Sequence, residues 1–122
     1  MGSMKDYFIK DKAEEGQRVD LHLPTGEKTD DYIVIRSIHS ETFISAMNKA
    51  KQDFMLARIE NEDAEIDNNK VLASLIKSWS FDEELTPESA TEFLTNAPQV
   101  GEQINKLAAD AKFHYGKKSK DS

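Results

Sequence analysis

The clearest pattern in the chain is an unbroken alternation of polar and apolar residues from Arg18 to Leu23. A period of two places one face of a strand against a core and the other face in water. A Pro-Thr-Gly-Glu turn sequence follows, and residues 32–38 then form a second run rich in β-branched side chains. The pattern predicts a β-hairpin over residues 17–39. A lone hairpin is only marginally stable, so it must pack on helices or on another chain.

From Ser40 onward the apolar residues recur with the longer period of a helix. Ser40 is a favourable N-cap, and Glu41 follows it at the helix end that stabilises acidic side chains. The main apolar stripe recurs at spacings of four and three and comprises Phe43, Met47, Ala50, Phe54 and Ala57. Further apolar residues broaden the stripe: Ile44, Met55, Leu56 and Ile59. We therefore expect this helix to contact two neighbours, and we expect the acidic stretch 60–67 to end it.

The C-terminal half of the chain carries the signals of further helices. Residues 71–79 have a wide apolar face that ends at a tryptophan. Thr86 with a proline after it is a strong helix start, and Pro98 begins another helix because proline is tolerated in a first turn. That last helix extends to residue 115, and Gly116 is a natural residue to follow a helix end.

The order of these elements predicts an α+β fold that is mainly α, with an N-terminal β-hairpin followed by about four helices. The length of 122 residues suits one domain with a core of its own. We divide the chain into an expression scar (1–3), an N-terminal arm (4–16), a single domain (17–116, with the hairpin at 17–39 and the helices at 40–116) and a disordered basic tail (117–122).

The charge and composition exclude several classes of partner. The formal net charge is -7, which argues against phosphate-directed binding of nucleic acid and against docking on anionic lipid. No apolar run approaches the ~18 residues of a membrane helix, and we expect no secretory signal because the first residues lack an apolar segment. The chain has no cysteine, so disulfides and thiolate zinc sites are excluded. We expect a partner that is basic or is recognised through apolar surface.

No arrangement of residues indicates catalysis, a metal or a cofactor. The three histidines are far apart in the sequence and lack the spacing of metal ligands. The acidic run that begins at Asp63 mimics a calcium-binding loop, but Asn68 and Ser74 stand where that loop needs Gly and Glu. No nucleophile elbow or Gly-rich phosphate loop is present. The sequence predicts a protein that is not an enzyme and takes no cofactor.

A group of aromatic and acidic residues between positions 79 and 93 is the candidate protein interface. Its members are Trp79, Phe81, Asp82, Glu83, Glu84 and Phe93. Trp79 and Phe93 each continue a helical stripe, which favours a core position for both. Phe81 continues no stripe and is the better candidate for contact with a partner. The acidic residues suit a solvated surface or, alternatively, a surface that attracts a basic partner.

This region also resembles a known family, the tail assembly chaperones of long-tailed, lambda-like phages. The resemblance lies in the order and spacing of several segments and covers about a third of the chain. The segments are 72–81 (LASLIKSWSF), 86–94 (TPESATEFL), 96–104 (NAPQVGEQI) and 108–113 (AADAKF). The hairpin and the long helix fit the general layout of that family more loosely.

The resemblance implies a chaperone of the host cell cytoplasm that is absent from the mature virion. Such proteins bind the tape measure protein, keep its long apolar helices soluble, and help to recruit tail tube subunits. They tend to form homo-oligomers. Many also exist in a longer form, in which a translational frameshift adds an extension that binds the tail tube protein. Here the candidate frameshift region is Gly116, Lys117 and Lys118, because Gly and Lys codons can form a slippery run.

A second hypothesis comes from the acidic charge alone. A small acidic inhibitor that mimics nucleic acid would present a rigid, continuous acidic surface to a DNA-binding enzyme. The apolar helical stripes and the basic tail count against this alternative.

Overall fold

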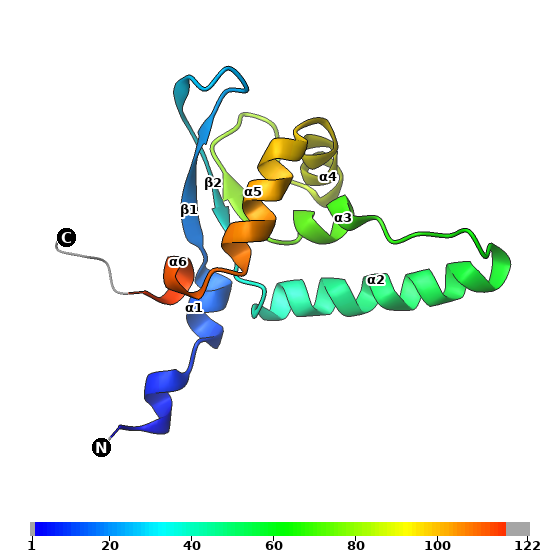
Figure 1. Ribbon diagram of the computed structural model, residues 1–122, viewed down its shortest axis with the longest axis horizontal. Helices are drawn as coiled ribbons and strands as arrows, with labels where there is room; N and C mark the ends of the chain where they lie inside the picture. The colour runs from blue at the N-terminus through cyan, green and yellow to red at the C-terminus, as the bar shows by residue number, and fades with distance from the viewer. Residues whose placement is uncertain (1, 117–122) are drawn as a thin grey trace.

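The alternating run forms strand β1 (Gln17–His22), which pairs antiparallel with β2 (Lys28–Ile35) in the computed structural model (Figure 1). The structure describes residues 2–116. In the hairpin, Val19 lies opposite Ile33, and both side chains are buried. The predicted hairpin is therefore confirmed, with its apolar face turned into the core.

A third strand was not predicted. Residues 71–79, expected to form one helix, divide into helix α3 (Asn68–Ala73) and strand β3 (Ile76–Trp79). β3 pairs antiparallel with β2, so the sheet order is β1-β2-β3. The backbone amide of Ser80 continues this ladder by donating to the carbonyl of Tyr32 at 3.0 Å. The helix prediction was wrong here because the open edge of β2 needs a partner for its backbone groups.

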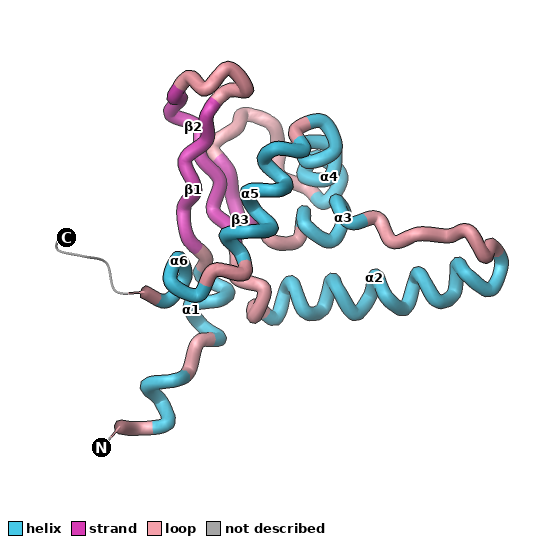
Figure 2. The backbone as a smooth tube through the Cα atoms, in the orientation of Figure 1, coloured by secondary structure: helices cyan, strands magenta, loops and turns pink. Residues whose placement is uncertain are grey.

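The two layers of the fold are the sheet and the helices that cover one of its sides (Figure 2). Helix α4 (Pro87–Asn96) starts with the predicted cap, in which the Thr86 side chain accepts a hydrogen bond from the Ser89 amide. Helix α5 (Pro98–Ala108) starts at the predicted proline. The core between the layers consists of buried aliphatic residues, among them Ile33, Ile35, Leu75, Leu94 and Ile104. The chain is thus α+β, as expected.

The predicted last helix ends earlier than expected and a short helix follows it. α5 stops at Ala108, and Asp110 caps α6 (Ala111–Tyr115) by accepting a hydrogen bond from the Phe113 amide. The Ile38 amide donates to the Ala108 carbonyl at 3.1 Å, so the chain after β2 binds the end of α5. Gly116 follows α6 with a φ of -67°, so the positive φ expected of a residue in this position is absent.

The N-terminal segment is more ordered than an arm. Met4–Tyr7 form a 3₁₀ turn, η1, and Lys10–Glu15 form helix α1, in which Ala13 is fully buried. α1 therefore belongs to the body of the fold. Within the N-terminal segment, only the residues before α1 stand clear of the other elements (Figure 1).

Helix α2 (Glu41–Glu60) is the most unusual element of the fold. Ser40 caps it as predicted, with its hydroxyl accepting a hydrogen bond from the Phe43 amide. The helix then extends away from the body, and the segment that follows returns alongside it (Figures 1 and 2). None of its residues is buried, although Phe43 packs against the core. The predicted apolar stripe is therefore only partly covered: Phe43, Met47, Ala50 and Phe54 are half-buried, and Ala57 is exposed.

Candidate functional site

The exposed helix α2 forms one wall of an open, apolar groove of about 620 Å³. Its side of the groove is lined by Ala46, Ala50, Phe54 and Ala57, which belong to the predicted stripe or share its face. The opposite wall comes from α3, β3 and the start of α4, and it includes Val71, Ile76, Leu85 and Ala90. The alanines keep the α2 wall shallow, so the groove has room for side chains of another segment.

Charged residues lie along the rim of this groove. On α2, the Lys49 ammonium and the Asp53 carboxylate form an ion pair at 3.1 Å across one helical turn. Glu65, Asp67 and Lys70 border the groove on the returning segment and at the start of α3. The groove thus has an apolar floor and a charged rim, which is the usual anatomy of a protein-binding surface.

The groove depends on a polar clamp that fixes the start of α2. One carboxylate oxygen of Glu14, in α1, accepts a hydrogen bond from the Thr42 amide at 2.7 Å, and the other accepts from the Thr42 hydroxyl at 3.0 Å. The Arg36 guanidinium also donates to Glu14, at 3.3 Å. The hydrogen bond from the Thr42 amide is the main reason that the pKa of Glu14 is lowered.

Arg36 connects this clamp to the opposite wall of the groove. Its guanidinium donates to the backbone carbonyls of Ser74 at 3.0 Å and Ile76 at 3.3 Å. One network therefore joins α1, the start of α2 and β3 through Arg36, the residue that follows β2, and sets the direction in which α2 leaves the body. Sequence reasoning missed Glu14, because its partner Thr42 lies 28 residues away and no local pattern links them.

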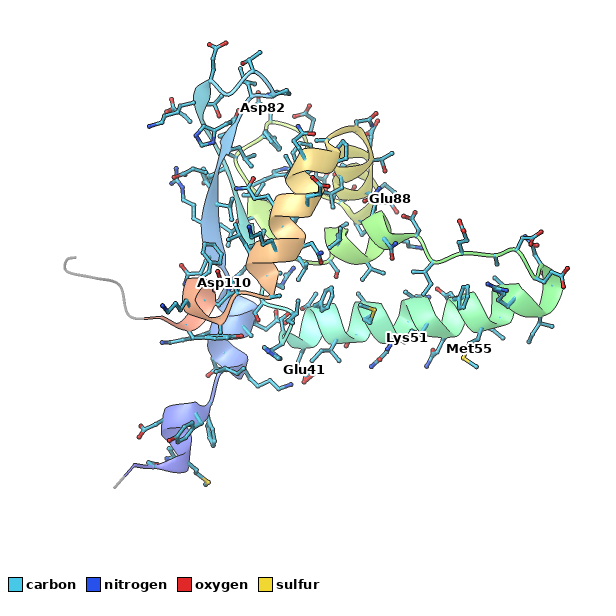
Figure 3. All side chains as sticks on the ribbon, in the orientation of Figure 1. Glu41, Lys51, Met55, Asp82, Glu88 and Asp110 are labelled. Carbon is cyan, nitrogen blue, oxygen red and sulfur yellow. The ribbon has the colours of Figure 1, made fainter. Side chains whose placement is uncertain are left out.

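The far end of α2 carries apolar side chains that contact little of the body. Met55, Leu56 and Ile59 are 68%, 65% and 80% exposed. Met55 points away from the groove, as does Lys51 one turn earlier (Figure 3). A helix that is apolar on several sides is normally covered by other protein. The groove and the far end of α2 together form a candidate surface for a partner.

The structure brings the predicted aromatic residues together in one cluster. The rings of Trp79, Phe81 and Phe93 pack edge to face, with centroids 5.1–5.9 Å apart. All three are half-buried against the core, and the Trp79 indole donates to the Glu83 carbonyl at 2.9 Å. Phe81, expected to be the free member, is held in this cluster as firmly as the other two.

The acidic residues Asp82, Glu83 and Glu84 are exposed in the loop between β3 and α4. Asp82 lies toward the hairpin turn and away from α2 (Figure 3). This loop is therefore separate from the far end of α2, and its contact with a partner stays a prediction. Of the candidate frameshift residues, Gly116 follows α6, whereas Lys117 and Lys118 lie outside the described residues.

His114 is a buried imidazole that the sequence did not single out. It is 2% exposed, and neither ring nitrogen has a hydrogen-bond partner within the described residues. Burial lowers its pKa, and the Leu107 backbone and the Asp110 carboxylate oppose that shift only in part. The neighbouring Tyr115 hydroxyl bonds to the Ser37 hydroxyl at 2.6 Å and fastens α6 to the body.

Comparison with models of known protein families, with curated proteins and with solved structures finds no match for this chain. Across residues 2–116, no helix has the length and apolar character needed to cross a membrane. Within the same range, no group of three or more His, Asp or Glu side chains is placed to hold a metal ion. The surface beside α2 is the feature of the described residues that most clearly suits a binding role.

Proposed function

We propose that this protein is a non-enzymatic chaperone that binds apolar helical segments of a partner protein. The observation that most directly supports this function is the 20-residue helix α2, which has no buried residue and borders an apolar groove. An amphipathic helix that docks in such a groove inserts a row of side chains spaced three and four residues apart. The net charge of -7 would keep the protein soluble while it presents this apolar surface.

Together with the resemblance of residues 72–113, this surface favours a particular class of chaperone. We propose a tail assembly chaperone of long-tailed phages, which binds and solubilises the tape measure protein and helps to recruit tail tube subunits. It would act in the host cell cytoplasm, be absent from the mature virion, and form homo-oligomers. A frameshift near Gly116 would add the extension that binds the tail tube protein.

The proposal expects a neighbouring gene to encode a very long helical protein, and the decisive experiment is co-expression of this chain with that neighbour. We expect the neighbour to shift from the insoluble to the soluble fraction and to copurify with this protein. If its solubility and recovery do not change, the chaperone function is wrong.

Two variants test whether the surface beside α2 is responsible. Ala50→Glu places a charge on the groove wall, and Ile59→Lys places one at the far end of α2. We expect both to reduce recovery of the soluble neighbour. Leu23→Lys is the matched control, because Leu23 is an exposed apolar residue on the hairpin, 48% exposed and far from α2. If all three variants support the neighbour as the natural protein does, the client binds elsewhere.

The longer form has its own test. Mass spectrometry of the protein made from its natural gene would reveal a product extended beyond the Gly116 region. The absence of any slippery heptamer in the messenger there would remove the frameshift at this site.

A further inference from the structure

The segment before α1 exposes three large apolar side chains. Met4, Tyr7 and Phe8 are 74%, 81% and 65% exposed. Met4 and Tyr7 begin and end the turn η1, and Phe8 follows in extended backbone, so the three residues form one short apolar segment. Among the described residues, the other exposed large apolar side chains are Leu23 on the hairpin and the three at the far end of α2. This apolar triplet is therefore a second concentrated apolar surface of the chain.

The turn η1 is held by a local capping box between Ser3 and Asp6 and not by packing on the body. A 3₁₀ segment of four residues has weak hydrogen-bond geometry, and none of its residues is buried. Helices that dock in grooves anchor themselves through residues at positions i, i+3 and i+4. Met4, Tyr7 and Phe8 have this spacing in the sequence, so the segment would present them on one face when it docks as a helix.

The groove beside α2 has the complementary properties. Its volume of about 620 Å³ lies within the range of pockets that enclose small ligands, which suits a few large side chains. The segment that closes its outer end, residues 60–67, contains five acidic residues. The arm (residues 4–9) carries Lys5 and Asp6, so its side chains have no net charge and its contact with the groove would be mainly apolar.

The arm of the same chain is badly placed to fill this groove. The Lys10 ammonium and the Glu41 carboxylate form an ion pair at 3.0 Å, which ties the start of α1, directly after the arm, to the first residue of α2. Ala50 and Phe54, at the apolar centre of the groove, lie roughly 13–20 Å further along that helix. Tyr7 is three residues from Lys10 and reaches about 10 Å at full extension. The arm also points away from α2 (Figure 1).

We propose that the arm of one copy docks in the groove of a second copy, so that two chains exchange their arms. Exchange is a closed, twofold arrangement in which each chain gives the same triplet and offers the same groove. With about 150 Å² for each of the three side chains and about half that total from the groove, two arms bury roughly 1,300 Å². Stable complexes bury about 1,200–2,000 Å², so the contact is large enough for a dimer.

This inference rests on the proposed function in one respect, namely that the groove is a docking site. It adds a form of regulation: the arm occupies the groove until a client helix displaces it. Arm and client would then compete, and a chain without the triplet would bind client more tightly.

Sedimentation of the full chain over a range of concentrations tests the exchange without any client. We expect a monomer–dimer equilibrium for the natural protein. Tyr7→Asp combined with Phe8→Asp should shift it to monomer, and Ala50→Glu should do the same from the groove side. Leu23→Asp is the matched control and should dimerise as the natural protein does. The two arm residues are mostly exposed, so their variants should keep the fold, which circular dichroism checks.

A disulfide experiment identifies the two surfaces in contact. The natural chain has no cysteine, so a cross-link forms only where one is introduced. A mixture of a Phe8→Cys chain with an Ala50→Cys chain should give a disulfide-linked heterodimer under mild oxidation. A mixture of Leu23→Cys with Ala50→Cys should give none.

Three results would overturn the exchange. The first is that the natural protein stays monomeric at every concentration, and the second is that the arm variants dimerise as the natural protein does. The third is that a Phe8→Cys/Ala50→Cys double variant forms its disulfide only within one chain. These results are distinct from failure of the proposed function. Loss of the exchange with client binding intact rejects the arm contact alone, whereas exchange without client binding rejects the chaperone.

Discussion

Removal of the Glu14 carboxylate is the sharpest test of how α2 is held. Glu14 accepts hydrogen bonds from the Thr42 amide and hydroxyl at 2.7 and 3.0 Å, and from the Arg36 guanidinium at 3.3 Å. Glu14→Ala deletes all three contacts. Arg36 keeps its bonds to the backbone of the β3 region, so the change is confined to the start of α2.

The expected loss of stability has two parts. The bond to the Thr42 amide satisfies a free N–H in the first turn of a helix, and such caps are worth about 1 kcal/mol. The bonds to the Thr42 hydroxyl and to Arg36 are charge-assisted, but the Glu14 side chain is 38% exposed, so screening reduces them to about 1 kcal/mol together. We expect Glu14→Ala to lower the free energy of unfolding by about 2 kcal/mol, and Glu14→Gln, which keeps an acceptor, by about half as much.

The pH dependence gives the same prediction an independent check. The pKa of Glu14 is lowered from its ordinary value of 4.5, because its hydrogen bonds favour the charged form. The unfolded chain therefore binds this proton at a higher pH than the folded chain does. The stabilisation is fully present above pH 4.5 and is lost as the pH falls through the lowered pKa. The difference between the natural protein and Glu14→Ala should shrink accordingly in acid.

Urea unfolding followed by circular dichroism, at pH 7 and at successively lower pH, measures both effects. Glu15→Ala is the matched control, since the Glu15 carboxylate is adjacent and makes no hydrogen bond within residues 2–116. The reasoning is refuted if, at pH 7, Glu14→Ala unfolds within about 0.5 kcal/mol of Glu15→Ala, which is the usual range for surface substitutions.

Four other substitutions test other parts of the fold. Gly16→Ala should destabilise the protein by more than about 2 kcal/mol, because φ is +80° and a Cβ would lie 2.5 Å from the Ile35 carbonyl oxygen. Gly26→Ala, with φ +93° and open space around it, should cost only about 1 kcal/mol. Equal denaturant midpoints for Gly16→Ala and Gly26→Ala would contradict this difference. Burial lowers the pKa of His114 below 6.5, so the natural protein should lose stability as the pH falls below 6.5. Denaturant unfolding at pH 7.5 and at pH 5.5 measures this loss, and it should be smaller for His114→Phe. Ile104→Ala opens a cavity at a fully buried position and should lower the free energy of unfolding by about 2–5 kcal/mol, as measured by denaturant unfolding. A loss below about 1 kcal/mol would contradict the burial of Ile104 in the core.

The sequence by itself determined the elements whose signals are local. The alternation from Arg18 to Leu23 predicts a strand, because a period of two has meaning within one short segment. The caps at Ser40 and Thr86 predict helix starts, because each side chain bonds a backbone amide only three residues away. These predictions needed no knowledge of what the elements pack against.

Only the tertiary structure decided which apolar surfaces are covered. Ile76–Trp79 is a strand because β2 offers it an edge, and no pattern within four residues reveals that partner. The stripe that includes Ala50 has the same helical spacing whether its neighbour is a core or an open groove. Glu14 holds α2 through a contact 28 residues away. Local sequence specifies the period and the ends of an element, whereas burial depends on neighbours that only the folded chain brings together.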